Sequence, residues 1–182
     1  KDKFSINSST GALSFSSAPD YETTSDTDKN NSYIVSVRAT DNASNNSDQT
    51  VTVTVDDVDE INPTLRSSSP ANNSAAIAVD SDLILTFSEA VDVESGNILI
   101  KKSSDNSTVE SIDVTSNQVT GSGTTQITIN PSSNLSSSTQ YYVQIPTTAF
   151  DDSSGNSYAG IIDTTSLSFT TADVGDPTLS ST

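Results

Sequence analysis

The chain of 182 residues contains no cysteine, histidine, methionine or tryptophan. Without cysteine there is no disulfide, no thiol nucleophile and no thiolate zinc site. Without histidine there is neither a Ser-His-Asp triad nor an imidazole metal ligand. Adjacent carboxylates such as Asp151 and Asp152 do not flank a substrate from opposite sides, as a glycosidase requires. We therefore expect a non-catalytic protein.

Positive charge is also scarce, with seven Lys and Arg against 24 Asp and Glu and a formal net charge of −17. A nucleic-acid interface needs a basic patch, and an anionic membrane surface would repel this chain. No apolar run approaches the roughly 20 residues of a spanning helix. The sequence predicts neither a nucleic-acid partner nor insertion into a membrane.

What the chain does have is alternation with a period of two. In residues 32–40, Tyr33, Val35 and Val37 share one face, and residues 50–55 alternate Thr and Val in the same way. The runs are short and end at Ser, Asn, Asp, Gly or Pro, which is typical of strands in antiparallel sandwiches. We predict an all-β fold of tandem antiparallel β-sandwiches. Between residues 63 and 172 we expect about seven strands, with these side chains buried: Leu85, Phe87, Ile127, Ile129, Val143 and Phe169.

A short internal sequence repeat indicates where domains begin. The segment "NPTLRSSSP" at 62–70 returns as "DPTLSST" at 176–182. This spacing suits one sandwich and its linker. We predict a partial sandwich at 1–61, a complete one at 62–173, and the start of a further linker at 174–182. The first piece is small for two sheets, so we expect its early strands upstream of Lys1.

The segment "VTVTVDDVDEINPTL" at 51–65 places Asp56, Asp57, Asp59 and Glu60 within five positions. Two unit charges about 4 Å apart repel by roughly 1 kcal/mol in water and about 4 at a dielectric near 20. The four carboxylates therefore either splay into solvent, as in a simple acidic linker, or hold a cation between them.

Three motifs make the first 63 residues resemble the C-terminal half of a cadherin repeat. "FSINSSTGALSFSSAPDYE" is similar to the cadherin stretch that leads to a D-x-E motif, and "YIVSVRATD" to a V-x-A-x-D strand. "VTVTVDDVDEINP" is similar to the closing D-x-N-D-N-x-P linker. Asp59 and Ile61 each stand where the family has Asn.

The cadherin resemblance implies Ca²⁺ ligands at the junction between the two domains. For that inter-domain site it names Asp20, Glu22, Asp57, Asp59 and Glu60. It assigns Asp41 to the preceding junction, with partner ligands outside this sequence. Carboxylates and carbonyls are the ligands that calcium prefers.

Residues 62 to about 173 resemble a bacterial Ig-like domain, on "PTLRSSSPANNSAAIAVDSDLILTFSEAVD", "TQYYVQIPTTAFDDSSGNSYAG" and "LSFTTAD". A cadherin-like repeat joined to such a domain resembles the extender region of a giant RTX-type adhesin on the surface of a bacterium. The resemblance implies type I secretion, an extracellular location, stiffening by calcium, and neighbouring tandem domains as partners.

Strand alternation adds ligands from the second domain. If the strand after Pro63 leads away from the linker, the strand at 82–88 returns to it, and the loop with Glu89, Asp92 and Glu94 then faces the linker. Counting strand directions in the same way places the loop with Asp151 and Asp152 at the linker end as well. A crossed strand topology would place both loops elsewhere. We therefore expect three further calcium ligands: Glu89, Asp151 and Asp152.

A second hypothesis is an accessory, carbohydrate-binding module of a secreted polysaccharide-degrading enzyme. Sugar would stack on Tyr141, Tyr142 and Tyr158. Tyrosines in such runs are more often core or edge residues. Their exposure decides between the two uses.

Overall fold

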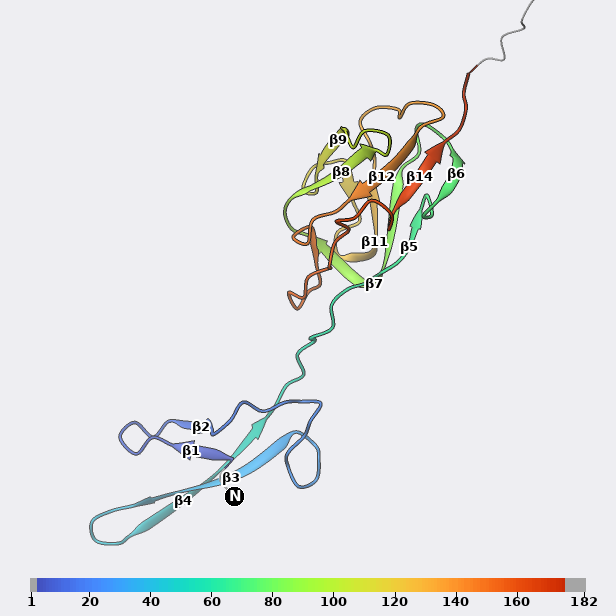
Figure 1. The fold of residues 1–182 in the computed structure, drawn as a ribbon. Helices are drawn as coiled ribbons and strands as arrows, with labels where there is room; N and C mark the ends of the chain where they lie inside the picture. The colour runs from blue at the N-terminus through green and yellow to red at the C-terminus, as the bar shows by residue number, and fades with distance from the viewer. Residues whose placement is uncertain (1–2, 176–182) are drawn as a thin grey trace, which may run out of the picture. The chain divides into compact units, whose positions relative to one another are not determined.

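All regular structure in the described part of the chain, residues 3–175 of the computed structural model, is β-structure (Figure 1). The predicted all-β class is confirmed. The chain divides into two compact units, residues 1–58 and 59–182. This division places Asp59 and Glu60 in the second unit. Most of the linker predicted at 174–182, including the repeat that begins at Asp176, lies outside the described residues.

The first unit consists of two hairpins. Strands β1 (Phe4–Ile6) and β2 (Leu13–Phe15) pair antiparallel, and so do β3 (Ser32–Thr40) and β4 (Asn46–Thr54). Val35 lies opposite Val51, as the alternation predicts.

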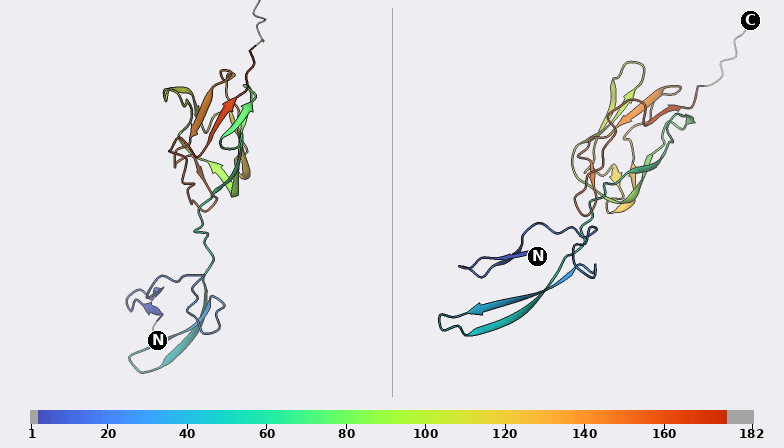
Figure 2. Two further views of the ribbon diagram at one scale, coloured as in Figure 1. Left: turned by 45° about the vertical axis from the view of Figure 1, so that its right-hand side comes forward. Right: turned by 60° about the horizontal axis from the view of Figure 1, so that its bottom comes forward.

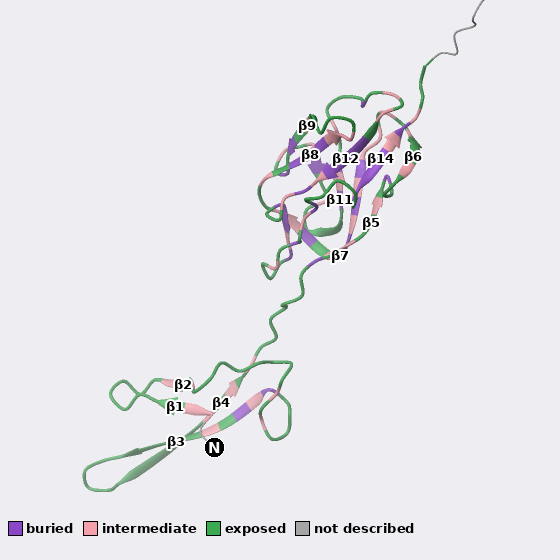
Figure 3. Cartoon of the chain, viewed as in Figure 1, coloured by how far each residue is buried: buried purple, intermediate pink, exposed green. Residues whose placement is uncertain are grey.

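A small aromatic cluster joins the hairpins. The ring centroid of Phe4 lies 4.4 Å from that of Phe15, and the Tyr33 ring stands edge-on to both. Tyr33 is buried, whereas the valines of β3 and β4 are half-exposed and Ile34 is 77% exposed (Figure 3). The unit thus has a core of three rings and a largely exposed surface. That further strands complete it stays a prediction.

The second unit is a sandwich of two five-stranded sheets, seen from two further directions in Figure 2. One sheet has the order β10-β11-β7-β13, with β5 also paired to β7, and the other has the order β6-β14-β12-β8-β9. Its strands are β5 (Leu65–Ser69), β6 (Ser74–Ile77), β7 (Leu83–Val93), β8 (Asn97–Lys102), β9 (Thr108–Asp113), β10 (Val119–Thr120), β11 (Thr124–Ile129), β12 (Gln140–Gln144), β13 (Phe150–Asp151) and β14 (Ser168–Thr171).

These ten strands exceed the expected seven in part because two of them, β10 and β13, are only two residues long. So short a segment carries no readable alternation. In addition, β6 pairs parallel with β14, whereas every other pair is antiparallel. The chain leaves the first sheet after β5 and enters the second as β6, which then runs in the same direction as β14. The expectation of a purely antiparallel sandwich is wrong at this edge.

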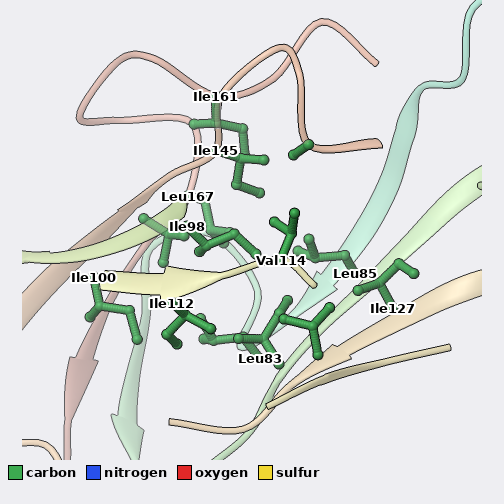
Figure 4. Packing of buried hydrophobic residues seen from close by; sticks show 14 of the residues in the cluster. Leu83, Leu85, Ile98, Ile100, Ile112, Val114, Ile127, Ile145, Ile161 and Leu167 are labelled. Carbon is green, nitrogen blue, oxygen red and sulfur yellow. The ribbon is translucent and has the colours of Figure 1, made fainter. Parts of the chain in front are cut away.

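The core fills the space between the two sheets (Figure 4). All six side chains predicted to be buried are at most 2% exposed. Their alternation in the sequence directs every second side chain inward, and burial of each contributes about 1.5–3 kcal/mol relative to exposure. This core fixes the strand ends that carry the acidic residues.

One predicted loop is in fact a strand. The sequence predicts that residues 89–93 leave the sheet, but β7 continues to Val93. Val91 is 1% exposed and keeps the inward alternation, and β13 pairs with this end of β7, with Asp151 opposite Asp92. Glu89 and Asp92 therefore project from a strand, and only Glu94 follows it.

Candidate metal centre

Three carboxylates from separate segments of the second unit meet at one end of the sandwich. Asp59 precedes β5, Glu89 lies in β7, and Asp152 directly follows β13. One carboxylate oxygen of each lies within 4.8 Å of those of the other two. Asp59 is exposed, Glu89 half-buried and Asp152 buried, with 7% of its surface accessible.

The strand pairing explains this meeting. Leu65 in β5 pairs with Phe87 in β7, so the chain before β5 runs beside the residues that follow Phe87. The Ser88 amide donates to the Thr64 carbonyl at 2.8 Å, and the Thr64 amide donates to Ser88 Oγ at 2.9 Å. Because β13 pairs with the far end of β7, Asp152 also arrives near Glu89.

The loop at 152–156 is held in shape by hydrogen bonds to the carboxylate of its first residue, Asp152. Asp152 Oδ1 accepts hydrogen bonds from the Ser154 and Asn156 amides, each at 2.8 Å, and Oδ2 accepts from Asn156 Nδ2 at 2.8 Å. Gly155 supplies the left-handed backbone that the turn needs, with φ of 88°. Asn156 Nδ2 also donates to the Asp59 carbonyl at 2.7 Å. One amide thus ties the linker to the loop.

The charge of this site is negative. Burial by itself would raise the pKa of Asp152, but the hydrogen bonds from Asn156, Ser154 and Gly155 outweigh it and hold the pKa below its usual value. No Lys or Arg within residues 3–175 forms an ion pair with any of the three carboxylates. Two charges 4.8 Å apart repel by about 0.9 kcal/mol in water and about 3.5 at a dielectric near 20. A bound cation would remove this repulsion.

The donor set suits calcium. Calcium binds oxygen at about 2.3–2.6 Å, so two oxygens on one ion stand at most about 5 Å apart. The separation of up to 4.8 Å between the three oxygens fits this limit. All the donors are hard oxygens, with none of the nitrogen or sulfur that zinc and copper prefer. Asp59, Glu89 and Asp152 are the residues that would hold the ion.

The other acidic residues predicted in this unit lie outside the group. Asp151 precedes Asp152 in extended chain, so its side chain points to the other side of β13. Its Oδ1 is buried without a hydrogen-bond partner, opposite Asp92, whose Oδ1 accepts from Ser122 Oγ at 3.1 Å. Glu60 is exposed beside the linker.

The acidic residues predicted in the first unit do not form a group of three carboxylates within residues 3–175. Asp20 accepts a bond from the Thr23 amide at 2.8 Å, Glu22 is exposed near it, and Asp57 is exposed in the linker. Asp41 begins the turn between β3 and β4.

The Asp41 loop repeats the bonding of the Asp152 loop. Asp41 Oδ1 accepts from the Ala43 and Asn45 amides at 2.8 and 2.9 Å, and Oδ2 accepts from Asn45 Nδ2 at 2.8 Å. Ser44 takes the left-handed conformation of Gly155, with φ of 66°. The sequence predicts the turn at 152–156 through the D-x-x-G-N motif of the Ig-like family, but it did not reveal the bond from Asn156 to the linker or the matching loop at Asn45. The shared D-x-x-x-N spacing of "DNASN" and "DSSGN" was the available signal for the second loop.

The tyrosine platform is contradicted. Tyr141, Tyr142 and Tyr158 are 0%, 2% and 6% exposed, so none offers an open ring face for a sugar. Tyr141 packs in the core beside Phe169, and Tyr158 stands edge-on to Phe87.

The second unit consists of two β-sheets packed face to face, and its N-terminal acidic segment is bound at one end. This arrangement is that of an immunoglobulin-like sandwich. The chain belongs to the bacterial Ig-like domain family, whose model matches residues 59–171. That match begins at the residue where the second unit begins.

Solved structures resemble the chain at low identity. CopC from Methylosinus trichosporium OB3b is 18% identical, with a TM-score of 0.45 over 64% of this chain and 99% of that protein. The S-layer protein rSbsC(31-844) is 18% identical, with a TM-score of 0.40 over 65% of this chain and 14% of that protein. No curated protein matches the chain. No helix among the described residues is long and apolar enough to cross a membrane.

Proposed function

We propose that this chain is a non-catalytic extender module of a large adhesin on the outer surface of a bacterium, stiffened by calcium. The observation that carries the proposal is the convergence of Asp59, Glu89 and Asp152 where the linker enters the Ig-like domain. Its partners are the neighbouring tandem domains of the same protein, and other regions bind the target.

The proposed mechanism is electrostatic. Without calcium, repulsion among the three carboxylates loosens the segment around Asp59. With calcium, the Asp59 carboxylate is bound to Glu89 and Asp152, while Asn156 holds the Asp59 carbonyl. The freely moving part of the linker then shortens. Weak binding suffices, because extracellular modules have dissociation constants of about 10⁻⁴–10⁻³ M.

The remaining acidic residues belong to the same proposal. Asp20, Glu22, Asp57 and Glu60 would complete a calcium junction of cadherin type, and Asp41 would serve the junction before it. Support for Asp41 comes from its loop, which has the same hydrogen bonds as the loop that holds the linker in the second unit.

The experiment that tests the proposal is thermal unfolding with 10 mM calcium and with chelator. For a dissociation constant of about 1 mM, calcium should add about 1.4 kcal/mol to the free energy of unfolding. Glu89→Gln should abolish this gain, since it removes one ligand charge and leaves the core intact. Glu94→Gln, which changes an exposed carboxylate just beyond the same strand, is the matched control and should keep the gain. Equal melting temperatures in calcium and chelator for the unchanged chain would refute the calcium site.

A further inference from the structure

The outer face of the β6-β14-β12-β8-β9 sheet is hollowed where such a face is normally flat and solvated. Tyr141 and Val143 of β12 point into the core, so Tyr142 between them points outward. Its register neighbours are Ser168 on β14 and Lys101 on β8. Despite facing outward, Tyr142 is only 2% exposed. The Lys101 side chain lies over its ring, with Nζ 5.7 Å from the ring centroid, and two loops enclose it further.

Two loops form the walls of this hollow. The turn after β8 brings Asn106, whose Oδ1 accepts a hydrogen bond of 3.0 Å from the Tyr142 hydroxyl. The segment before β14 brings Thr164 and Thr165. That segment is held in shape by Asp163, which accepts bonds from Thr165 and Ser166 at 2.6–3.1 Å. The hollow measures about 270 Å³.

The floor of the hollow is fixed as well. Ser168 is 4% exposed, and its hydroxyl contacts the side-chain oxygens of Asn72 and Asn73, each at 3.1 Å. The Ser168 amide donates to Asn72 Oδ1 at 2.9 Å. Polar groups are thus present at the base of the hollow as well as at its rim.

A second hollow of about 330 Å³ adjoins the first and shares Ser103 and Gln140 with it. It continues past Thr139 along the end of β12. The two hollows on either part of this shared strip are together called the β12 groove. Each part lies near the lower end of the size range of small-molecule sites, which suits one or two sugar units.

The chemistry of the lining selects the ligand class. The residues that line the β12 groove are Ser, Thr, Asn, Gln and Tyr. Beside them the Lys101 ammonium lies over the Tyr142 ring and contacts Gln144 Oε1 at 3.5 Å, so this charge is already engaged within the chain. A cation would require carboxylates, and an apolar ligand would require aliphatic walls. Hydroxyls and amides both donate and accept hydrogen bonds, as the hydroxyls of a sugar do.

We propose that the β12 groove binds a neutral oligosaccharide. Binding is by hydrogen bonds to the amides and hydroxyls of the groove, and it needs no exposed aromatic ring, so it differs from stacking on a tyrosine platform. It is also independent of calcium, because no carboxylate of residues 3–175 lines the groove. Single-module affinity is weak, and tandem copies in one protein would raise the avidity.

The test uses the full chain on an array of neutral and acidic oligosaccharides, followed by titration of any ligand found. The double variant Ser103→Ala/Gln140→Ala removes two side chains from the strip that both hollows share, and it should weaken binding at least about tenfold. Gln126→Ala removes an exposed glutamine from β11 in the other sheet and should leave binding unchanged. Binding should be equal in calcium and in chelator.

The proposal that the β12 groove binds a neutral oligosaccharide would be overturned by either of two results. One is that the array retains no neutral oligosaccharide, and the other is that the double variant binds as well as the unchanged chain. Loss of binding in chelator would also overturn it, because the carboxylate site would then be responsible. The calcium-dependent shift in melting temperature is measured separately. A failure of glycan binding is therefore distinguishable from a failure of the proposed calcium site.

Discussion

At the scale of single residues, burial decides what Tyr158 does. The alternation in the sequence gives it no assignment, yet it is 6% exposed and packs against Phe87 and Phe150, with centroid distances of 5.1 and 6.5 Å. Burial raises the pKa of Tyr158 to about 12, because the apolar surroundings disfavour the phenolate.

Alkaline unfolding should report this burial. The folded-state pKa of Tyr158 lies above the unfolded value of about 10, so its contribution to stability is complete below pH 10. It is lost as the pH rises from about 10 to about 12, and amounts to roughly 2 kcal/mol. The measurement is the free energy of unfolding by denaturant across this window. Tyr158→Phe should not show this part of the loss of stability. If the free energies of unfolding of the two proteins fall equally between pH 10 and pH 12, Tyr158 is not the group responsible.

A second residue-scale prediction concerns Gly121. Its φ is 99°, and a Cβ placed there would lie 2.1 Å from the Gln126 carbonyl oxygen, inside the β10–β11 hairpin. Gly155 also has a positive φ, of 88°, but has open space around it. Gly155→Ala should therefore cost only the conformational strain of about 1–2 kcal/mol. Gly121→Ala should cost clearly more, as measured by chemical denaturation, and equal costs would show that the hairpin shifts without penalty.

At the scale of elements, the D-x-x-x-N loop occurs once in each unit with the same internal hydrogen bonds. The sequences "DNASN" and "DSSGN" differ at three of five positions, yet both close by the same side-chain bonds between the first and fifth residues. The pattern is local, so the sequence alone is enough to specify the loop. Only in the second unit does the structure give the fifth residue a bond to a linker carbonyl.

Substitution of the two asparagines should separate these roles. Asn156→Ala removes two hydrogen bonds of Asn156 Nδ2, one to the Asp59 carbonyl and one to Asp152 Oδ2. It should weaken calcium binding by at least about fivefold, because one hydrogen bond contributes about 1 kcal/mol. Asn45→Ala changes the matching loop of the first unit and is the control. Calorimetric titration with calcium measures both. If the two substitutions weaken binding equally, the bond to the Asp59 carbonyl is not what positions the site.

At the scale of the whole molecule, the joining segment is short. The Val55 amide donates to the Asn31 carbonyl at 2.9 Å in the first unit, and the Asp59 carbonyl accepts from Asn156 at 2.7 Å in the second. The residues between them, Asp56, Asp57 and Val58, are exposed. The behaviour of these few residues determines how freely the units move.

Small-angle scattering of the chain should therefore respond to calcium. With millimolar calcium the distribution of maximum dimensions should narrow, and chelator should broaden it again, because repulsion between the carboxylates returns. Glu89→Gln should give the broad distribution under both conditions. Identical profiles with calcium and with chelator would mean that the acidic run is a solvated linker.

The sequence by itself determined the class of fold and most of its core. Alternation with a period of two is a local property, and it identified Leu85, Ile127 and Phe169 as buried because each strand must direct one face inward. Strand alternation also named Glu89 and Asp152, and the cadherin resemblance named Asp59, each among a larger set of acidic candidates.

Only the tertiary structure decided which members of that set converge. Asn156 and Asp59 are 97 positions apart, and their contact depends on β5 and β13 both pairing with β7. Local patterns carry no information on such pairings. For this reason the sequence predicts an end of β7 before Glu89 and does not predict the parallel pairing of β6 with β14. The β12 groove arises in the same way, because Tyr142 faces outward by its alternation and becomes buried only when distant loops rise around it.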